Sequence, residues 1–160
     1  MRIGWLMALA GLLIPTTTSG NAQQSPRRSD SVVKAGATAS RPDVHGVQVI
    51  SIDLEIEKGW WIYANPVNHD KEFLDPARTK VVIKTKMKSL SSVKYPGGRT
   101  LKDEFDRFDV FEGKLKIEAT VKRAAGDTGP LDIEIHVNAF NRSLLLVPGV
   151  VRLTVPEPTK

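Results

Sequence analysis

Two stretches in the second half of the chain alternate strictly between apolar and polar residues, and this alternation constrains the fold most. The first runs from Leu115 to Val121 and the second from Leu131 to Ala139. A period of two is the pattern of a β-strand with one face buried and the other in solvent. Shorter runs of the same kind lie between turn residues, and no amphipathic helix stands out. We therefore predict an all-β protein.

We expect about seven short strands, at 47–56, 60–63, 79–85, 92–95, 114–122, 131–140 and 151–155. Antiparallel strands with one polar face pack as two face-to-face sheets, so we predict an immunoglobulin-like antiparallel β-sandwich. The apolar phase shifts by one residue between Val49 and Ile50, which predicts a β-bulge. The turn from Gly126 to Pro130 predicts that 114–122 and 131–140 form a hairpin.

The N-terminus has the pattern of a signal peptide at residues 1–22. Arg2 precedes an apolar stretch over 3–14, Pro15 follows it, and Gly20 and Ala22 suit a cleavage site. The stretch is short for a membrane-spanning helix, which needs about 20 apolar residues. An uncleaved anchor is the alternative reading. We expect a periplasmic or secreted protein with no integral membrane segment after cleavage.

Residues 23–42 are rich in small and polar residues, which predicts a flexible linker followed by a folded domain at 43–160. The whole chain has a net charge of +5, but the residues before position 43 carry five of its 23 basic residues and one of its 18 acidic ones. Nucleic-acid binders concentrate basic charge on the folded surface. The charge distribution therefore argues against a nucleic-acid partner.

No motif in the chain indicates an enzyme, and we predict no catalytic residue, no metal and no cofactor. Cysteine is absent, which excludes thiol chemistry. His69, Asp70 and Glu72 lie close in sequence, but their spacing matches no structural zinc pattern. The acidic run over 103–112 has the composition of a solvated surface. The triplet 141–143 fits a glycosylation sequon, which matters only if the source glycosylates exported proteins.

The segment between the last two predicted strands is unusually apolar for a loop. It contains Phe140, Leu144, Leu145, Leu146 and Val147. We expect these side chains to be packed, with the phenylalanines of the irregular segment at 100–113 (Phe105, Phe108 and Phe111) as their cover. The arrangement is either a hydrophobic satellite of the core or a capped pocket or partner surface.

Four segments carry a resemblance to a known family. They are Gly59-Trp60-Trp61-Ile62-Tyr63-Ala64-Asn65-Pro66, Val93-Lys94-Tyr95-Pro96, Val110-Phe111-Glu112-Gly113 and Gly126-Asp127-Thr128-Gly129-Pro130-Leu131. In this order they resemble the N-terminal periplasmic domain of DsbD-type thiol:disulfide interchange proteins, over about Val44 to Val155. The resemblance implies an immunoglobulin-like sandwich that exposes a redox cysteine pair.

In the family the pair lies in a segment written roughly Gln-Ala-Cys-x-x-x-x-Cys-Leu-x-Pro. This chain has Asn138-Ala139-Phe140-Asn141-Arg142-Ser143-Leu144-Leu145-Leu146-Val147-Pro148, which without gaps places Phe140 and Leu145 on the two cysteine positions. The family's cap loop, which shields the pair with a phenylalanine, is similar to Asp103-Glu104-Phe105. The resemblance thus implies a binding region made of Phe140, Leu145, Asp103, Glu104, Phe105 and Tyr63.

We therefore expect an exported, non-catalytic binding or interaction domain that cannot exchange disulfides itself, with an envelope protein as a possible partner. The alternative is an accessory domain that docks a thioredoxin-fold or other envelope enzyme. A hydrolase is a third reading and requires a polar cleft that joins histidine and carboxylates. A purely structural role predicts that Phe105, Phe140 and Leu145 are buried core.

Overall fold

The computed structural model describes residues 26–69, 72–85, 90–102, 106–125, 127 and 129–156. These residues form β-strands and two short 3-10 helices. In chain order the elements are η1 (Ser29–Val32), β1 (Val33–Ala39), β2 (Val47–Ile56), β3 (Trp61–Tyr63), η2 (Glu72–Ala77), β4 (Lys80–Lys84), β5 (Leu90–Lys94), β6 (Arg99–Lys102), β7 (Arg107–Phe111), β8 (Lys114–Lys122), β9 (Leu131–Val137), β10 (Ala139–Phe140) and β11 (Gly149–Val155).

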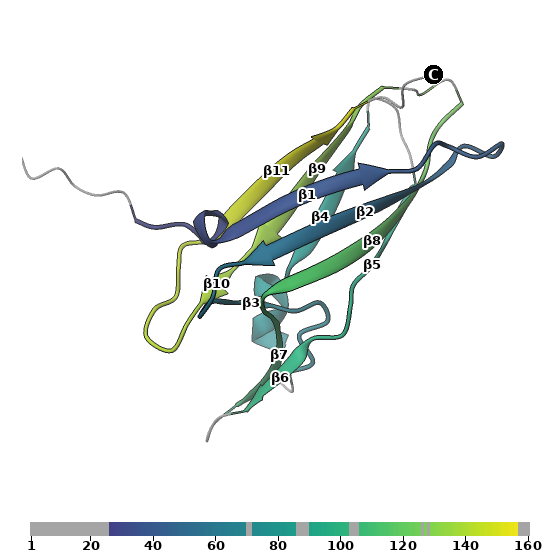
Figure 1. Cartoon of the computed structure of the whole chain (residues 1–160). Coiled ribbons are helices and arrows are strands. Elements are labelled where there is room, and N and C mark those ends of the chain that lie inside the picture. The colour runs from purple at the N-terminus through teal and green to yellow at the C-terminus, as the bar shows by residue number, and fades with distance from the viewer. Residues whose placement is uncertain are drawn as a thin grey trace, which may run out of the picture.

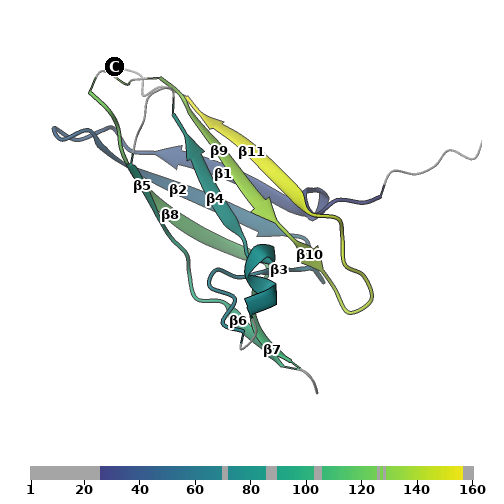
Figure 2. The ribbon, with the colours of Figure 1, turned by 180° about the vertical axis from the view of Figure 1, so that it is seen from behind.

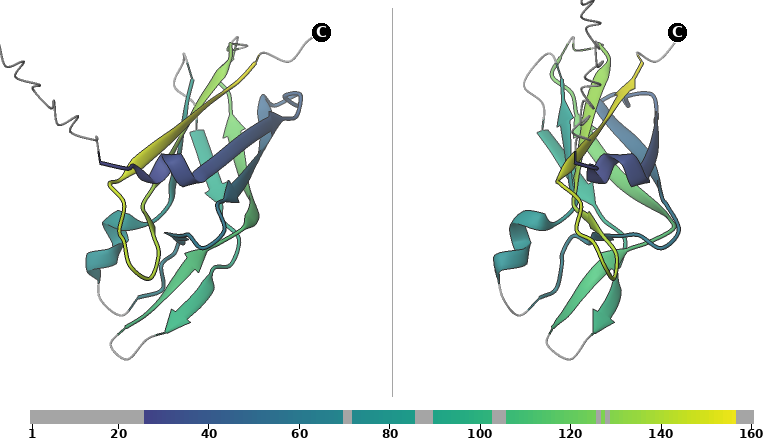
Figure 3. Two further views of the ribbon diagram at one scale, coloured as in Figure 1. Left: turned by 60° about the vertical axis from the view of Figure 1, so that its left-hand side comes forward. Right: turned by 90° about the vertical axis from the view of Figure 1, so that its left-hand side faces the viewer.

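The strands form three antiparallel sheets, two of which are the layers of a sandwich (Figure 1). One layer has the order β1-β2-β8-β5 and the other the order β11-β9-β4. The third sheet, β10-β3-β7-β6, lies at one end of the sandwich, and its β6–β7 hairpin projects from that end. Strands β1 and β11 pack side by side, so the two layers meet along one edge (Figure 3). The predicted immunoglobulin-like antiparallel sandwich is confirmed.

The core lies between the two layers and is built by the alternation seen in the sequence. Every second residue of β2, β8 and β9 points inward and is buried: Ile50, Ile52, Leu54, Ile56, Ile117, Ala119, Val121, Leu131, Ile133, Ile135 and Val137. Burial of one large aliphatic side chain contributes about 1.5–3 kcal/mol. These three strands therefore supply most of the apolar burial that holds the layers together.

The predicted bulge between Val49 and Ile50 is wrong. Strand β2 pairs with β8 without interruption from Val47 to Glu55. The inward phase continues to Gln48, which is buried, while Val49 is exposed. The Gln48 amide accepts a hydrogen bond from Arg123 Nη1 (3.1 Å) and donates one to the Ser40 carbonyl (2.8 Å). Because these bonds satisfy the buried amide, a polar residue occupies a core position, and in the sequence this has the pattern of a phase shift.

The predicted hairpin of 114–122 with 131–140 is also wrong. Strand β8 lies between β2 and β5 in one layer, and β9 lies between β11 and β4 in the other. The connection crosses between the layers, and Arg123 Nη2 ties it down by donating to Asp127 Oδ1 (3.1 Å) and to the Gly129 carbonyl. Alternation reports that one face of a strand is buried, and it does not report which strand is the neighbour.

The linker predicted at 23–42 is wrong for most of its described part, because η1 and β1 belong to the sandwich. Strand β1 pairs with β2 over its whole length, from Val33 opposite Ile56 to Ala39 opposite Ile50. The middle of β1 is made of small residues, so it lacks the large apolar side chains that mark a strand. Backbone hydrogen bonds and the buried Val32 and Val33 hold it instead. The predicted signal peptide lies outside the described residues.

This boundary changes the charge argument, because the predicted linker contains four basic residues that the structure places in the described domain. Two of them are already paired: Arg27 Nη2 lies 3.2 Å from Glu57 Oε2, and Arg28 Nε lies 3.2 Å from Asp30 Oδ1. The basic excess therefore does not lie outside the folded domain, and the absence of a nucleic-acid partner stays a prediction.

The segment at 100–113, expected to be irregular, forms the β6–β7 hairpin. Helix η2 precedes β4 (Figure 2). Within the described residues, no helix is long and apolar enough to cross a membrane.

Candidate functional site

Four aromatic side chains gather on the outer face of the sheet β10-β3-β7-β6, and we call them the aromatic cluster: Trp61, Tyr63, Phe108 and Phe140. Strand alternation places them there, because Ile62 between Trp61 and Tyr63 points into the core. The Phe140 ring centroid lies 4.7 Å from that of Tyr63, 5.8 Å from that of Trp61 and 5.9 Å from that of Phe108. Tilted pairs at such distances contribute about 0.5–1.5 kcal/mol each beyond burial. All four rings remain partly exposed.

The loop at 141–148 folds back so that Leu145 lies opposite Phe140 in an isolated antiparallel bridge. The flanking bonds run from Leu146 N to the Ala139 carbonyl and from Asn141 N to the Leu144 carbonyl, each 2.9 Å. This pattern defines a non-hydrogen-bonded pair, whose Cα atoms typically lie about 4.5 Å apart. Disulfides join Cα atoms about 4.4–6.8 Å apart. The backbone at Phe140 and Leu145 thus has a geometry that suits a disulfide.

The tip of this loop is held by one side chain. Asn141 Oδ1 accepts hydrogen bonds from the backbone N–H groups of Ser143 and Leu144, both at 2.9 Å. An asparagine side chain that bonds to its following backbone in this way fixes a turn. The apolar residues that follow are therefore presented by an ordered turn.

Most of the apolar residues in this loop face solvent. Leu144, Leu145 and Val147 are 52%, 64% and 39% exposed, and Leu146 alone of the loop leucines is buried. The expectation that these side chains are packed is therefore wrong for three of them. Leu145 lies opposite Phe140 of the aromatic cluster, and Leu144 and Val147 are exposed in the same loop. Exposed apolar side chains gathered in one loop are the kind of feature that marks an interaction site. We call these three residues together with the aromatic cluster the contact surface.

The two ends of the loop are tied to the N-terminal segment by the fully buried Ser29. Its hydroxyl donates to the Val147 carbonyl (2.9 Å) and accepts from the Ala139 backbone N–H (2.9 Å), while its own N–H donates to the same Val147 carbonyl (2.8 Å). Figure 3 shows η1 beside the start of β11, where the yellow-green loop returns to the sandwich. The segment predicted as a flexible linker therefore positions the candidate site.

A polar group lies behind Phe108. His69 Nε2 lies 3.1 Å from Asp106 Oδ1, and the imidazole is 3% exposed; its ring centroid is 6.3 Å from that of Phe108. Partial burial raises the pKa of the Tyr63 phenol, so the hydroxyl stays neutral over a wider pH range. The described residues contain no group of three potential metal ligands. Of the aromatic cluster, Phe108 contacts the His69 ring, and the Asp106 side chain is 33% exposed.

The predicted site residues have three outcomes. Phe140 and Leu145 are backbone partners, and Tyr63 packs on Phe140. Asp103, Glu104 and Phe105 lie outside the described residues, so the predicted contact between Phe105 and Phe140 cannot be placed. Of the other two phenylalanines proposed as cover, Phe108 contacts Phe140, whereas Phe111 is buried in the core.

In the described part of the acidic run, Asp109 and Glu112 are held by other side chains. Asp109 is buried and accepts hydrogen bonds from Asn68 Nδ2 (2.6 Å) and Thr100 Oγ1 (2.7 Å). Glu112 accepts a bond from Trp61 Nε1 (2.9 Å) and pairs with Arg99 Nε (3.1 Å). Asp109 and Glu112 therefore have separate structural partners, and Asp106 of the same run pairs with His69.

Two functional residues were missed by the sequence analysis. Trp61 was read as part of a strand, and its alternation with buried Ile62 was the signal that it faces outward. Ser29 carried no signal, because its partners lie more than 100 positions away in the chain.

A family model for the N-terminal region of the thiol:disulfide interchange protein DsbD matches residues 31–140. The match ends at Phe140, so it does not reach Leu145. No curated protein matches the chain.

Among solved structures, the N-terminal periplasmic domain of ScsB from Proteus mirabilis is similar, with 10% identity and a TM-score of 0.57 over 79% of this chain. The chain spans about half of that structure, 46% of its length. The reduced DsbD N-terminal domain of Neisseria meningitidis has 14% identity and a TM-score of 0.49, with 81% of this chain and 89% of that one covered.

Proposed function

This chain belongs to the family of DsbD N-terminal domains, and because it contains no cysteine, we propose that it is an exported, non-catalytic binding domain. Disulfide exchange requires a thiolate that attacks a disulfide sulfur, and no residue of this chain can supply one. What remains is the presentation of a surface. The single observation that carries the proposal is the exposure of Leu144, Leu145 and Val147 beside the aromatic cluster.

The contact surface is suited to a protein partner because it is both apolar and ordered. Asn141 fixes the turn and Ser29 fixes both ends of the loop, so little conformational entropy is lost on binding. Aromatic side chains give a large contact area at a low entropic cost. A purely structural role would bury Leu145, whereas its side chain is the most exposed of the loop leucines.

We propose that the partner is an envelope protein, and that docking of a thioredoxin-fold protein is the specific alternative within this function. Phe140 and Leu145 stand where the resemblance puts the cysteine pair, so a thioredoxin-fold protein would meet the same loop with apolar side chains in place of a disulfide. Such docking would transfer no electrons. The pattern of residues 1–22 supports a periplasmic or secreted location.

Affinity capture from the native envelope fraction tests the proposal, with Leu145→Glu as the disrupting variant. A charge at the centre of an apolar interface typically costs several kcal/mol of binding free energy, so proteins that bind this surface should be lost. Val49→Glu is the matched control, because Val49 is an exposed aliphatic residue (48%) on β2 of the β1-β2-β8-β5 layer.

Titration of a purified thioredoxin-fold protein from the same envelope then distinguishes the accessory role from binding to another envelope protein. Binding that Leu145→Glu abolishes and Val49→Glu retains supports the accessory role. Capture of the same proteins by the wild type and both variants would contradict the assignment of the contact surface.

A further inference from the structure

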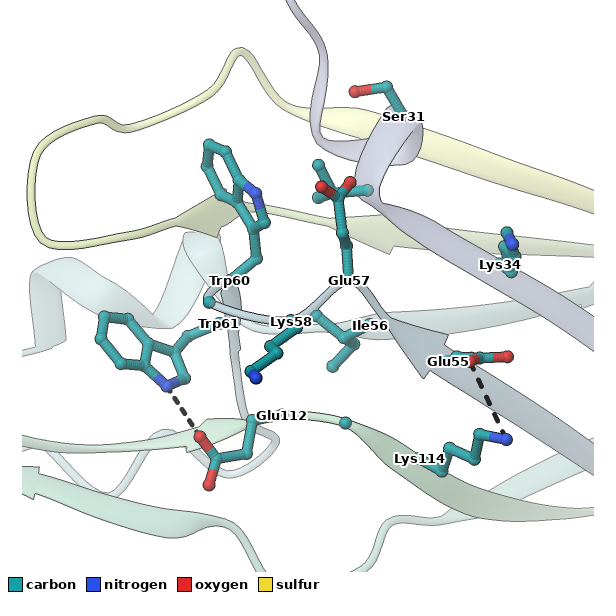
Figure 4. Close-up of a pocket in the computed structure, with 13 residues that line it drawn as sticks. Ser31, Lys34, Glu55, Ile56, Glu57, Lys58, Trp60, Trp61, Glu112 and Lys114 are labelled. Atoms are coloured by element: carbon teal, nitrogen blue, oxygen red, sulfur yellow. Dashed lines mark hydrogen bonds and ion pairs between the residues drawn. The ribbon is translucent and has the colours of Figure 1, made fainter.

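A concave pocket of about 630 Å³ lies between the start of β1, the turn from β2 to β3 and the turn from β7 to β8, and nothing above assigns it a role. Its walls include the indole rings of Trp60 and Trp61, which lie at one side in Figure 4, and Lys34, Glu55 and Lys114 at the other. Pockets that bind small molecules typically enclose about 300–1,000 Å³ and combine apolar walls with a few polar groups. The size and lining of this pocket are in that range.

The three carboxylates at the pocket are already neutralised. Glu57 pairs with Arg27 at 3.2 Å, Glu112 with Arg99 at 3.1 Å, and Glu55 with Lys114 at 3.8 Å. The two arginines come from outside the lining residues. The carboxylates therefore leave little negative charge for a cationic ligand.

Two lysines of the lining have no ion-pair partner among the described residues. Lys34 lies opposite Glu55 in the β1–β2 register, but Glu55 forms its ion pair with Lys114 on its other side. Lys58 lies in the turn that leads to the two tryptophans, and Figure 4 draws no bond to its amine. The pocket thus has a positive excess next to the partly exposed Trp61, whereas Trp60 is 8% exposed.

The two tryptophans are held in place by contacts with side chains at the edge of the pocket. Trp60 is stacked under the Arg27 guanidinium, whose centre lies 5.2 Å from the ring centroid, and Trp61 Nε1 donates to Glu112 Oε2 (2.9 Å). The Arg27 guanidinium already covers one face of the Trp60 ring, which disfavours a second cation there. An apolar body can rest against the partly exposed Trp61 indole while an anionic group meets the amines.

We infer that this pocket binds a small organic anion with an apolar body, such as an aryl-substituted carboxylate. Lys58 and Lys34 bind the anionic group, and Trp60 and Trp61 contact the body. This site is independent of the proposed protein-binding function, although Trp61 borders both the pocket and the contact surface.

The test uses three probes and intrinsic fluorescence. 4-Phenylbutyrate has both features, 4-phenylbutylamine has the same body with the opposite charge, and butyrate lacks the aromatic body. The chain has three tryptophans; two line the pocket, and Trp5→Phe removes the third from any preparation that retains residues 1–22. The indole N–H resonances of Trp60 and Trp61 give a second, site-specific readout.

We expect saturable binding of 4-phenylbutyrate that shifts both indole resonances, and binding of the amine and of butyrate at least about tenfold weaker. A partly exposed ion pair contributes up to about 1 kcal/mol, so Lys58→Gln and Lys34→Gln should each weaken binding about fivefold. Lys94→Gln is the matched control, because Lys94 is an exposed lysine of β5 that does not line the pocket.

Three results would overturn the inference. They are equal affinity for the amine and the acid, unchanged indole resonances at saturating 4-phenylbutyrate, and wild-type affinity in both lysine variants. Binding of an acidic, phenylalanine-containing peptide without any binding of 4-phenylbutyrate would instead identify a protein segment as the occupant, and would also overturn it.

Discussion

The backbone pairing of Phe140 and Leu145 predicts that the double variant Phe140→Cys, Leu145→Cys forms one intramolecular disulfide. The two residues are a non-hydrogen-bonded antiparallel pair, flanked by the bonds between Leu146 and Ala139 and between Asn141 and Leu144. Side chains of such a pair leave the sheet on the same face and close together. Cysteines at these positions should therefore meet without movement of the backbone.

The magnitudes follow from the burial of the two side chains. Truncation of a fully buried phenylalanine costs about 3–5 kcal/mol, and Phe140 is partly exposed, so we expect a loss of about 2 kcal/mol. Leu145 is 64% exposed, and its loss should be less than about 1 kcal/mol. Closing a loop of about six residues by a disulfide returns about 2 kcal/mol in the chain-entropy model. The oxidised variant should thus regain most of the stability that the reduced variant loses.

Urea denaturation of the oxidised and reduced forms measures this difference, and a thiol count on the folded monomer reports the bond. The matched control is Phe140→Cys, Leu144→Cys, because neighbouring residues of an extended chain point to opposite faces. The control should keep two free thiols under mild oxidation. If the Phe140/Leu145 variant also keeps both thiols, the pairing described here and the placement of these residues on the cysteine positions are wrong.

Three further predictions concern residues that support the fold around the site. Ser29→Ala leaves the buried Ala139 N–H without its partner and should lower the free energy of unfolding by about 1–3 kcal/mol, measured by urea denaturation; an unchanged midpoint would contradict the anchoring role. Arg123→Ala leaves Asp127 buried and unpaired and should cost about 3–5 kcal/mol, whereas Lys116→Ala, which breaks only an exposed pair with Asp53, should cost less than about 1 kcal/mol. Because burial raises the pKa of Tyr63, the folded state holds the phenol proton more tightly than the unfolded chain does. The contribution of Tyr63 to stability is therefore complete below about pH 10 and is lost as the pH rises further. The unfolding midpoint should fall less steeply between pH 9 and pH 11 in Tyr63→Phe than in the wild type.

The strands that could be predicted from sequence are those in which large, buried apolar residues alternate with exposed polar ones. Strands β8 and β9 are of this kind, and β2 is too once Gln48 is counted as a core position. Strand β1 was missed because small residues make up its centre. The pairing of strands was not predictable, because alternation is the same in a hairpin and in two strands of opposite layers.

The candidate site was predictable only in part. The apolar loop was visible because its composition is unusual, and the resemblance put Phe140 and Leu145 together. The exposure of the loop was not predictable, since the same apolar residues could equally form a packed satellite of the core. The role of Ser29 depends on a buried hydroxyl that joins distant backbone groups, which leaves no local pattern.

The hydrogen bonds of Ser29 also have a consequence for the order of folding. The donor and acceptor of the Ser29–Val147 bond are separated by 118 positions, so this contact cannot form until nearly the whole chain has been synthesised. Contacts of such long range slow folding, typically to milliseconds or seconds in β-sandwiches. The β1–β2 pair needs only a short connection and can form early, whereas the loop at 141–148 receives its final anchor last. A chain interrupted before Val147 would therefore contain the complete β1-β2-β8-β5 layer but would lack β11 and the anchor that holds the loop of the contact surface.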